Sequence, residues 1–136
     1  MEKYPITKKN SSYLFNIVVP LFNAEKYIEK CLNSIIKQSY KKFHVQIVDD
    51  CSTDSSYEIA SSICNKHKNF EIIKNPRRLG ALNNIFNLLN KKIKEPSRTI
   101  DILIDGDDYL YSGDVLNIIN EKYSETSCLI TVSYTH

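Results

Sequence analysis

The chain has 136 residues, of which 42% are hydrophobic and 25% charged, and this composition fits one globular domain of the soluble type. The net charge is +2, with basic and acidic residues interspersed, so no electrostatic argument favours nucleic acid as a partner. No apolar run approaches the roughly 18 residues that span a bilayer, and no signal-peptide pattern opens the chain. We therefore expect neither a nucleic-acid partner nor a transmembrane segment.

The four cysteines are widely spaced and include no C-x-x-C pair. This spacing argues against a zinc site and favours a reducing, cytoplasmic setting over a disulfide framework. Peripheral attachment to the inner face of a membrane stays open.

Residues 1–13 are polar and show no period, so we expect a flexible N-terminal arm ahead of a domain that covers residues 14–136. In that domain, apolar runs alternate with segments of helical spacing. Pro20 is expected to end the first strand, and Asn23 to be the N-cap of the first helix. The expected strands cover about 15–19, 43–48, 70–73, 100–104 and 128–134. The expected helices cover about 24–36, 56–67, 81–93 and 114–123.

Near-continuous apolar strands that alternate with helices predict a mostly parallel sheet with helices on both faces, which is a Rossmann-like α/β fold. Right-handed crossovers bring the carboxyl ends of all parallel strands to one edge of the sheet. Ligands of open α/β sheets bind outside that edge. Three polar loops follow strand ends here, at 20–23, 49–50 and 105–108, and we expect them to converge on one crevice.

The run Asp105-Gly-Asp-Asp108 places three carboxylates within four residues, and these repel one another unless a cation or protons neutralise them. Oxygen-only ligands suit Mg²⁺ or Mn²⁺, which share their coordination with substrate phosphates. Gly106 is expected to let the backbone turn tightly, so that the carboxylates face the same side. The alternative is a solvated turn that caps the next helix. A calcium-binding EF-hand loop fails on spacing, because its twelfth position would be Leu116.

Three other side chains near strand ends have chemistry suited to a nucleotide, each with a structural alternative. A carboxylate of the pair Asp49-Asp50 can accept the N3–H of uracil, which cytosine lacks, or both can cap the next helix. Phe22 is placed to stack on a base, or is a covered core residue. Arg78 precedes a helix N-terminus, where it can reach a phosphate or base, or is a surface arginine.

Four segments in register then resemble the large family 2 type of inverting glycosyltransferase with a GT-A fold, from about Phe15 to the end of the chain. They are Ile17-Val-Val-Pro-Leu-Phe-Asn23, Val48-Asp-Asp-Cys-Ser-Thr-Asp54, Leu79-Gly-Ala-Leu-Asn-Asn84 and Leu103-Ile-Asp-Gly-Asp-Asp108. The resemblance implies transfer of a hexose or N-acetylhexosamine from a nucleotide-sugar donor, a UDP-sugar, with inversion and with help from Mn²⁺ or Mg²⁺. It implies nucleotide binding by Pro20, Phe22, Asn23, Asp49, Asp50, Arg78, Asp105 and Asp107. It implies metal binding by Asp107 and Asp108.

The sequence departs from the family pattern in two places. Cys51 stands where glycine or asparagine is usual, and no residue after Asp108 matches the element that supplies the general base. The catalytic residues therefore stay unknown, and we expect a GT-A domain truncated after the Asp-x-Asp region, with the acceptor part missing. The alternatives are a nucleotide-sugar-binding module without turnover and a structural α/β domain whose acidic loops are only caps. The acceptor and the oligomeric state are left unassigned.

Overall fold

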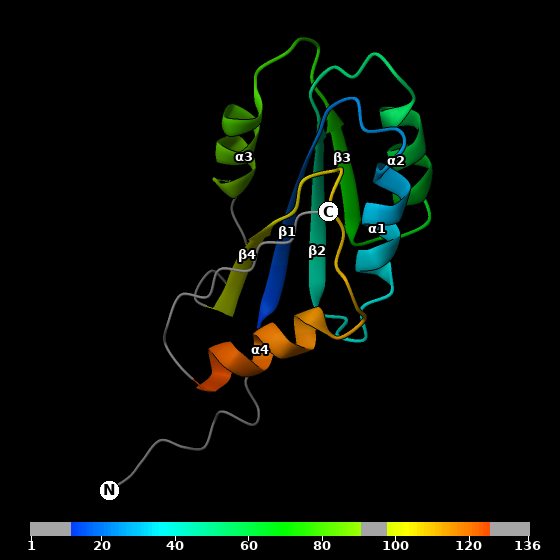
Figure 1. The fold of residues 1–136 in the computed structure, drawn as a ribbon. Coiled ribbons are helices and arrows are strands. Elements are labelled where there is room, and N and C mark those ends of the chain that lie inside the picture. Colours follow the sequence, from blue (N-terminus) through cyan, green and yellow to red (C-terminus); the bar gives the residue numbers. More distant parts are fainter. Residues whose placement is uncertain (1–11, 91–97, 126–136) are drawn as a thin grey trace, which may run out of the picture.

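The structure is a computed structural model that describes residues 12–90 and 98–125 (Figure 1). Strands and helices alternate along the chain, as predicted. Their bounds are β1 (Leu14–Leu21), α1 (Ile28–Ile36), β2 (Phe43–Asp49), α2 (Ser56–Cys64), β3 (Phe70–Lys74), α3 (Ala81–Leu89), β4 (Thr99–Leu103) and α4 (Val115–Glu125). The strand predicted over 128–134 lies outside the described residues, and no described helix has the length and apolarity needed to cross a membrane.

The four strands form one parallel sheet in the order β3-β2-β1-β4. Helices α1 and α2 lie on one side of this sheet and α3 lies on the other (Figure 1). This arrangement follows from right-handed crossovers, because the chain moves outward from β1 to β3 and then returns across the sheet to β4. The predicted α/β class with a parallel sheet is confirmed.

Strand β1 is the centre of the core, and its side chains alternate between the two faces. Phe15, Ile17 and Val19 pack in one cluster with the buried residues of α1. On the opposite face, a smaller cluster joins Val18 to Leu88 of α3. Burial on both faces explains why the sequence of β1 is apolar almost without interruption.

The helix α4 crosses the end of the sheet at which the strands begin (Figure 1). Tyr13, expected in the flexible arm, is packed there: its backbone N–H donates to Asn120 Oδ1 at 3.1 Å, and its ring meets Tyr123 edge to face. The rest of the predicted arm, residues 1–11, lies outside the described residues. The packed domain therefore includes at least one residue before the predicted boundary.

Two predictions at the end of β1 are wrong. Pro20 does not end the strand, which continues to Leu21. The β1–β4 pairing stops at Val18, so the missing N–H of Pro20 removes no hydrogen bond from the sheet. Asn23 is not the cap of α1, because residues 24–27 form a turn and the helix is capped at Tyr27.

The inward face of α3 also differs from the prediction. Apolar spacing predicts that the inward residues are Leu82, Ile85, Phe86, Leu89 and Ile93, of which Ile93 lies outside the described residues. Leu82 is instead 80% exposed and Phe86 64% exposed, whereas Asn84 and Leu88 are buried. The helix turns this side to the sheet because Asn84 is hydrogen-bonded to the end of β3 through Asn75.

Candidate nucleotide and metal site

A cleft of about 260 Å³ lies at the carboxyl ends of the central strands. It brings together the three loops that were predicted to converge, together with the start of α3. Its lining residues are Pro20, Leu21, Phe22, Asn23, Ala24, Tyr27, Asp50, Arg78, Ala81, Asn84, Asp105, Gly106 and Asp107. The cleft therefore contains most of the predicted nucleotide-binding residues, and Asp49 is the exception.

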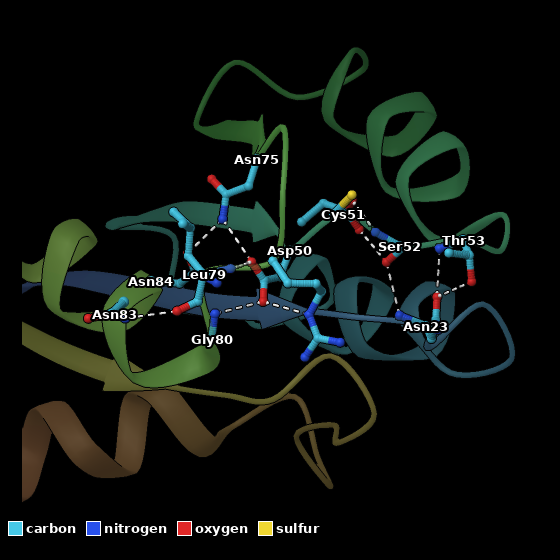
Figure 2. Close-up of polar contacts among 12 residues, drawn as sticks. Asn23, Asp50, Cys51, Ser52, Thr53, Asn75, Leu79, Gly80, Asn83 and Asn84 are labelled. Atoms are coloured by element: carbon cyan, nitrogen blue, oxygen red, sulfur yellow. Dashed lines mark hydrogen bonds and ion pairs between the residues drawn. The ribbon is translucent and has the colours of Figure 1, made fainter.

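Asp50 organises one wall of the cleft (Figure 2). Its Oδ1 accepts hydrogen bonds from Asn75 Nδ2 at 3.0 Å and Leu79 N at 2.8 Å. Its Oδ2 accepts from Arg78 Nε and Gly80 N, both at 3.0 Å. Burial alone would raise the pKa of Asp50, but the hydrogen bonds from Leu79, Asn75 and Gly80 outweigh it and keep this pKa below its usual range. The carboxylate is therefore ionised and fixes the loop before α3.

Gly80 is required where that loop turns into α3. Its φ is +92°, a conformation that is strained for any residue with a side chain. This conformation directs the Gly80 N–H toward Asp50. Gly80 is the N-cap residue and lies just before α3. A carboxylate at this end of a helix is also favoured by the helix dipole.

Phe22 and Arg78 form a flat platform beside Asp50. The Arg78 guanidinium carbon lies 3.6 Å from the centroid of the Phe22 ring, which is a cation–π contact. Phe22 is 38% exposed, so it is not a covered core residue. Arg78 is more than a surface arginine, because it is paired with Asp50 on one side and stacked on Phe22 on the other.

Asn84 is a cleft residue that the sequence reasoning missed. Its side chain is 2% exposed, and its Oδ1 accepts a hydrogen bond from Asn75 Nδ2 at 2.7 Å. Its side chain helps to lower the pKa of Asp50, but within the described part of the chain its Nδ2 is not in hydrogen-bonding geometry with any acceptor. A buried donor without a partner is costly unless a ligand or water satisfies it. The available signal was its place at the end of the segment Leu79-Gly-Ala-Leu-Asn-Asn84, because its polarity alone does not distinguish it from Asn83 and Asn87 of the same helix.

Asp49 lies outside the cleft, contrary to the prediction of nucleotide binding. Its side chain is fully buried, and its Oδ2 accepts a hydrogen bond from Ser52 N at 3.0 Å. The structural alternative, a cap for the next helix, is not observed either, because Ser55 is the N-cap of α2 and no side chain caps it; Asp49 instead fixes the loop ahead of α2. Asn23 joins the same loop, because its Oδ1 accepts from Thr53 N at 2.8 Å while its own N–H donates to Ser52 Oγ.

Cys51 has a φ of +65°, in the left-handed region that few side chains adopt without strain. This conformation gives a physical reason for the glycine or asparagine that is usual there. We expect Cys51→Asn to raise the free energy of unfolding by roughly 0.5–1 kcal/mol, because asparagine tolerates this conformation better. Urea denaturation of both proteins measures the change. Cys64→Ser, at a buried position in α2, is the contrasting variant and should instead lose stability.

Asp105 and Asp107 line the other side of the cleft, and Asp108 lies next to them and completes an acidic triad. One carboxylate oxygen from each residue lies within 4.8 Å of those of the other two. Partial burial raises the pKa of Asp105, and the negative charges of Asp107 and Asp108 raise it further. Three oxygen ligands this close together fit a divalent cation of the Mg²⁺ or Mn²⁺ type, which would relieve their repulsion.

Gly106 lies in a tight turn, as predicted, and the Asp108 N–H donates across this turn to the Asp105 carbonyl oxygen at 2.9 Å. The φ of Gly106 is not positive, and the structure adds a second reason for glycine, which is space. A Cβ at this position would lie 2.9 Å from Leu21 Cδ1 and 3.3 Å from the Pro20 carbonyl oxygen. The Gly106 N–H also donates to that oxygen at 3.1 Å. The triad is thereby held directly against the end of β1.

Cys31 lies beneath the triad and donates from Sγ to the Asp105 carbonyl oxygen at 3.7 Å. Burial raises the pKa of Cys31 to about 12, with further increases from the charges of Asp108, Asp107 and Asp105. Its thiol therefore stays protonated and acts as a packing residue. The three described cysteines, Cys31, Cys51 and Cys64, are free thiols, and Cys128 lies outside the described residues.

The parallel sheet with helices on both faces matches solved structures with the GT-A fold. The crystal structure of Staphylococcus aureus TarS 1-349 in complex with UDP matches this fold with a TM-score of 0.71 at 31% identity, over 82% of this chain and 32% of that one. The mannosyltransferase PcManGT from Pyrobaculum calidifontis, in complex with GDP-Man and Mn²⁺, matches the fold with a TM-score of 0.68 at 24% identity, over 79% and 32% of the two chains.

The protein family described as glycosyl transferase family 2 matches residues 16–136, and this chain belongs to that family. A relative is the poly(ribitol-phosphate) beta-N-acetylglucosaminyltransferase TarS of Staphylococcus aureus (strain Mu50 / ATCC 700699). The two are 33% identical over 116 residues, which is 82% of this chain. The matched region spans 20% of that relative's length.

Proposed function

We propose that this chain is the donor-binding part of an inverting, metal-assisted glycosyltransferase that uses a UDP-sugar. The observation that carries the proposal is the pairing of two unlike walls in one cleft. Asp50, Phe22 and Arg78 form a flat wall suited to a base, and the acidic triad forms a wall suited to a metal-bound diphosphate. A nucleoside diphosphate has both halves in one molecule, and the relative TarS has been solved with UDP and with UDP-GlcNAc.

The base half has the groups to read the edge of a uracil ring. We infer that the ring stacks on the platform of Phe22 and Arg78, with the chain at Pro20 and Asn23 beside it. Asp50 accepts the uracil N3–H, and the unpartnered Nδ2 of Asn84 donates to a carbonyl oxygen of the ring. Both oxygens of Asp50 already accept two hydrogen bonds each. We infer that the uracil N3–H replaces the hydrogen bond from Arg78 to Asp50, because the Arg78 side chain is 56% exposed.

The phosphate half is assigned to the acidic triad. We infer that Asp105 contacts the ribose, while Asp107 and Asp108 hold Mn²⁺ or Mg²⁺ against the diphosphate. A divalent metal there supplies Lewis-acid stabilisation of the leaving nucleoside diphosphate. Other residues of the chain hold the triad in position for the metal. Gly106 lets the triad lie against β1, and the buried Cys31 packs beneath the triad.

A second candidate function is nucleotide-sugar binding without turnover. Inversion needs a general base that takes the proton of the acceptor hydroxyl. Among the described residues that line the cleft, the ionisable carboxylates are Asp50, Asp105 and Asp107, all with roles in donor binding. Hydrolysis or transfer of a UDP-sugar by this chain supports the enzyme, whereas metal-dependent UDP binding without either supports the binding module.

Base selectivity tests the donor assignment. With Mn²⁺ present, we expect UDP to bind about tenfold or more tightly than CDP, because cytosine would leave Asp50 and Asn84 with mismatched partners. Asn84→Leu should weaken UDP binding by roughly tenfold, through loss of one buried hydrogen bond. Calorimetric titrations with UDP, CDP and GDP measure both effects. Equal affinity for UDP and CDP in the unaltered chain would refute the assigned uracil contacts.

A further inference from the structure

A second cavity, of about 600 Å³, lies between α1 and the segment that follows the triad. We call it the lysine groove. One side is a polar stripe of α1 and its flanks, formed by Lys26, Glu29, Lys30, Asn33, Ser34 and Lys37. The other side is the segment Tyr109 to Gly113. None of these residues lines the nucleotide cleft.

The groove is long, and one end of it adjoins the donor site. Its α1 residues recur every three or four positions, and a stripe from Lys26 to Lys37 extends for about 16 Å at roughly 1.5 Å per residue. Tyr109 directly follows Asp108 of the triad, and Tyr27, next to Lys26, lines the nucleotide cleft. Figure 1 shows the segment after β4 passing along α1 on its way to α4.

The floor of the groove is fixed by hydrogen bonds between its two sides. Leu110 N donates to Ser34 Oγ at 3.0 Å. Gln38 is fully buried; its Nε2 donates to the Ser112 carbonyl oxygen at 2.6 Å, and its Oε1 accepts from Leu116 N at 3.0 Å. A buried polar residue used in this way holds the segment at a set distance from the helix. The groove is therefore already formed in the absence of a ligand.

The charges along the groove are mostly positive and spaced apart. Lys26, Lys30 and Lys37 are exposed, and none forms an ion pair within residues 12–90 and 98–125, whereas Glu29 is the single acidic residue of the lining. The Lys30 ammonium lies 3.9 Å from the centroid of the Tyr109 ring, which keeps it over the groove. Along the helix axis, Lys26 and Lys30 are about 6 Å apart, and Lys30 and Lys37 are about 10 Å apart. This spacing suits a ligand with negative charges repeated along its length better than one compact anion.

We propose that the lysine groove binds an extended anionic acceptor chain and leads its hydroxyl-bearing end toward the donor site. The assignment of this ligand as acceptor rests on the proposed glycosyltransferase function. Phosphate or carboxylate groups along the chain pair with the lysines, and Tyr109 and Tyr111 offer ring surfaces to the units between them. The acidic triad would repel such a chain, so the lysines also offset that repulsion next to the reaction centre.

The test uses two anionic probes, short-chain inorganic polyphosphate and oligogalacturonate, with neutral dextran as the comparison. Titrations are made with EDTA and without UDP, so that no metal joins a probe to the triad. We expect Lys30→Gln/Lys37→Gln to weaken binding of at least one anionic probe by roughly tenfold, and to leave UDP binding with Mn²⁺ unchanged. The matched control is Lys66→Gln/Lys68→Gln, two exposed lysines after α2 that lie outside the groove. This control should bind the probes as the unaltered chain does.

The two probes separate phosphate from carboxylate recognition, and either one supports the groove if the lysine variant weakens it. Three results would overturn the proposal: no binding of either anion, equal binding of dextran, or an equal loss in the control variant. A chain that binds UDP but neither anion contradicts the groove alone. A chain that binds an anion through these lysines but does not bind UDP contradicts the donor-site proposal and leaves the groove as an anion site.

Discussion

Asp108→Asn should abolish the metal-dependent part of UDP binding. The substitution keeps the shape of the side chain but removes one of the three charges whose carboxylate oxygens lie within 4.8 Å of one another. Loss of a charged contact of this kind costs on the order of 3 kcal/mol, which corresponds to roughly a hundredfold in affinity. Calorimetric titration of UDP at fixed Mn²⁺, repeated with Mg²⁺ and with EDTA, measures the change.

The matched control for this variant is Glu58→Gln, a loss of one exposed negative charge on α2, away from the cleft. It should bind UDP as tightly as the unaltered chain. Asp107→Asn should behave like Asp108→Asn. If Asp108→Asn bound UDP with unchanged metal dependence, the triad would be the solvated turn that was the alternative from the outset.

Asp50→Asn should both destabilise the fold and weaken UDP binding. Four donors converge on the Asp50 carboxylate, and an amide group cannot accept from all of them because its nitrogen is itself a donor. We expect the free energy of unfolding to fall by about 3 kcal/mol. UDP affinity should fall by roughly tenfold or more, because the loop with Arg78, which leads into α3 and Asn84, loses its anchor. Urea denaturation and titration with UDP measure the two effects separately.

The stability difference should depend on pH in a defined direction. The pKa of Asp50 is lowered in the folded state, so its carboxylate contributes stability above the unfolded pKa of about 3.9. That contribution decreases as the pH falls toward the folded pKa. The gap in unfolding free energy between the unaltered chain and Asp50→Asn should therefore be constant near neutral pH and shrink below about pH 4.

Asp49→Asn is the control for binding as distinct from stability. Asp49 is also a buried carboxylate, but it accepts a hydrogen bond from Ser52 N and does not line the cleft. This variant should lose stability while its folded form binds UDP almost normally. A parallel loss of UDP affinity in both variants would show that the binding defect of Asp50→Asn comes from general loosening of the loops.

The sheet was predictable because β1 is apolar almost without interruption, which suits a strand buried on both faces, and because β2 alternates apolar with polar residues and is β-branched. The convergence of the loops after β1, β2 and β4 followed from the handedness of the crossovers alone. The three acidic residues of the triad could be placed on that basis from the sequence alone. These features depend on local patterns and on one general rule of topology.

The rest depended on contacts between residues far apart in the sequence. Apolar spacing in α3 pointed away from Asn84, yet Asn84 faces the sheet because Asn75, at the end of β3, bonds to it. The fit of Gly106 against Leu21 and Pro20 depends on the distance between β1 and the triad, which no single segment encodes. Asp49 and Asp50 are adjacent and chemically identical, and only the alternation of side chains along β2 separates their roles.

The pairing of β1 with β4 has a consequence for the order of folding. Asn16 and Asp101 are hydrogen-bonded across these strands although 85 positions separate them in the sequence. Closing so long a loop is entropically costly, and contacts of this range slow folding. The residues of the base half, from Phe22 to Asn84, all precede β4, whereas the triad follows it. We therefore expect the cleft to be completed late in folding, and we expect a bound nucleotide with its metal to stabilise the completed cleft, because it would contact residues on both sides of β4 in the sequence.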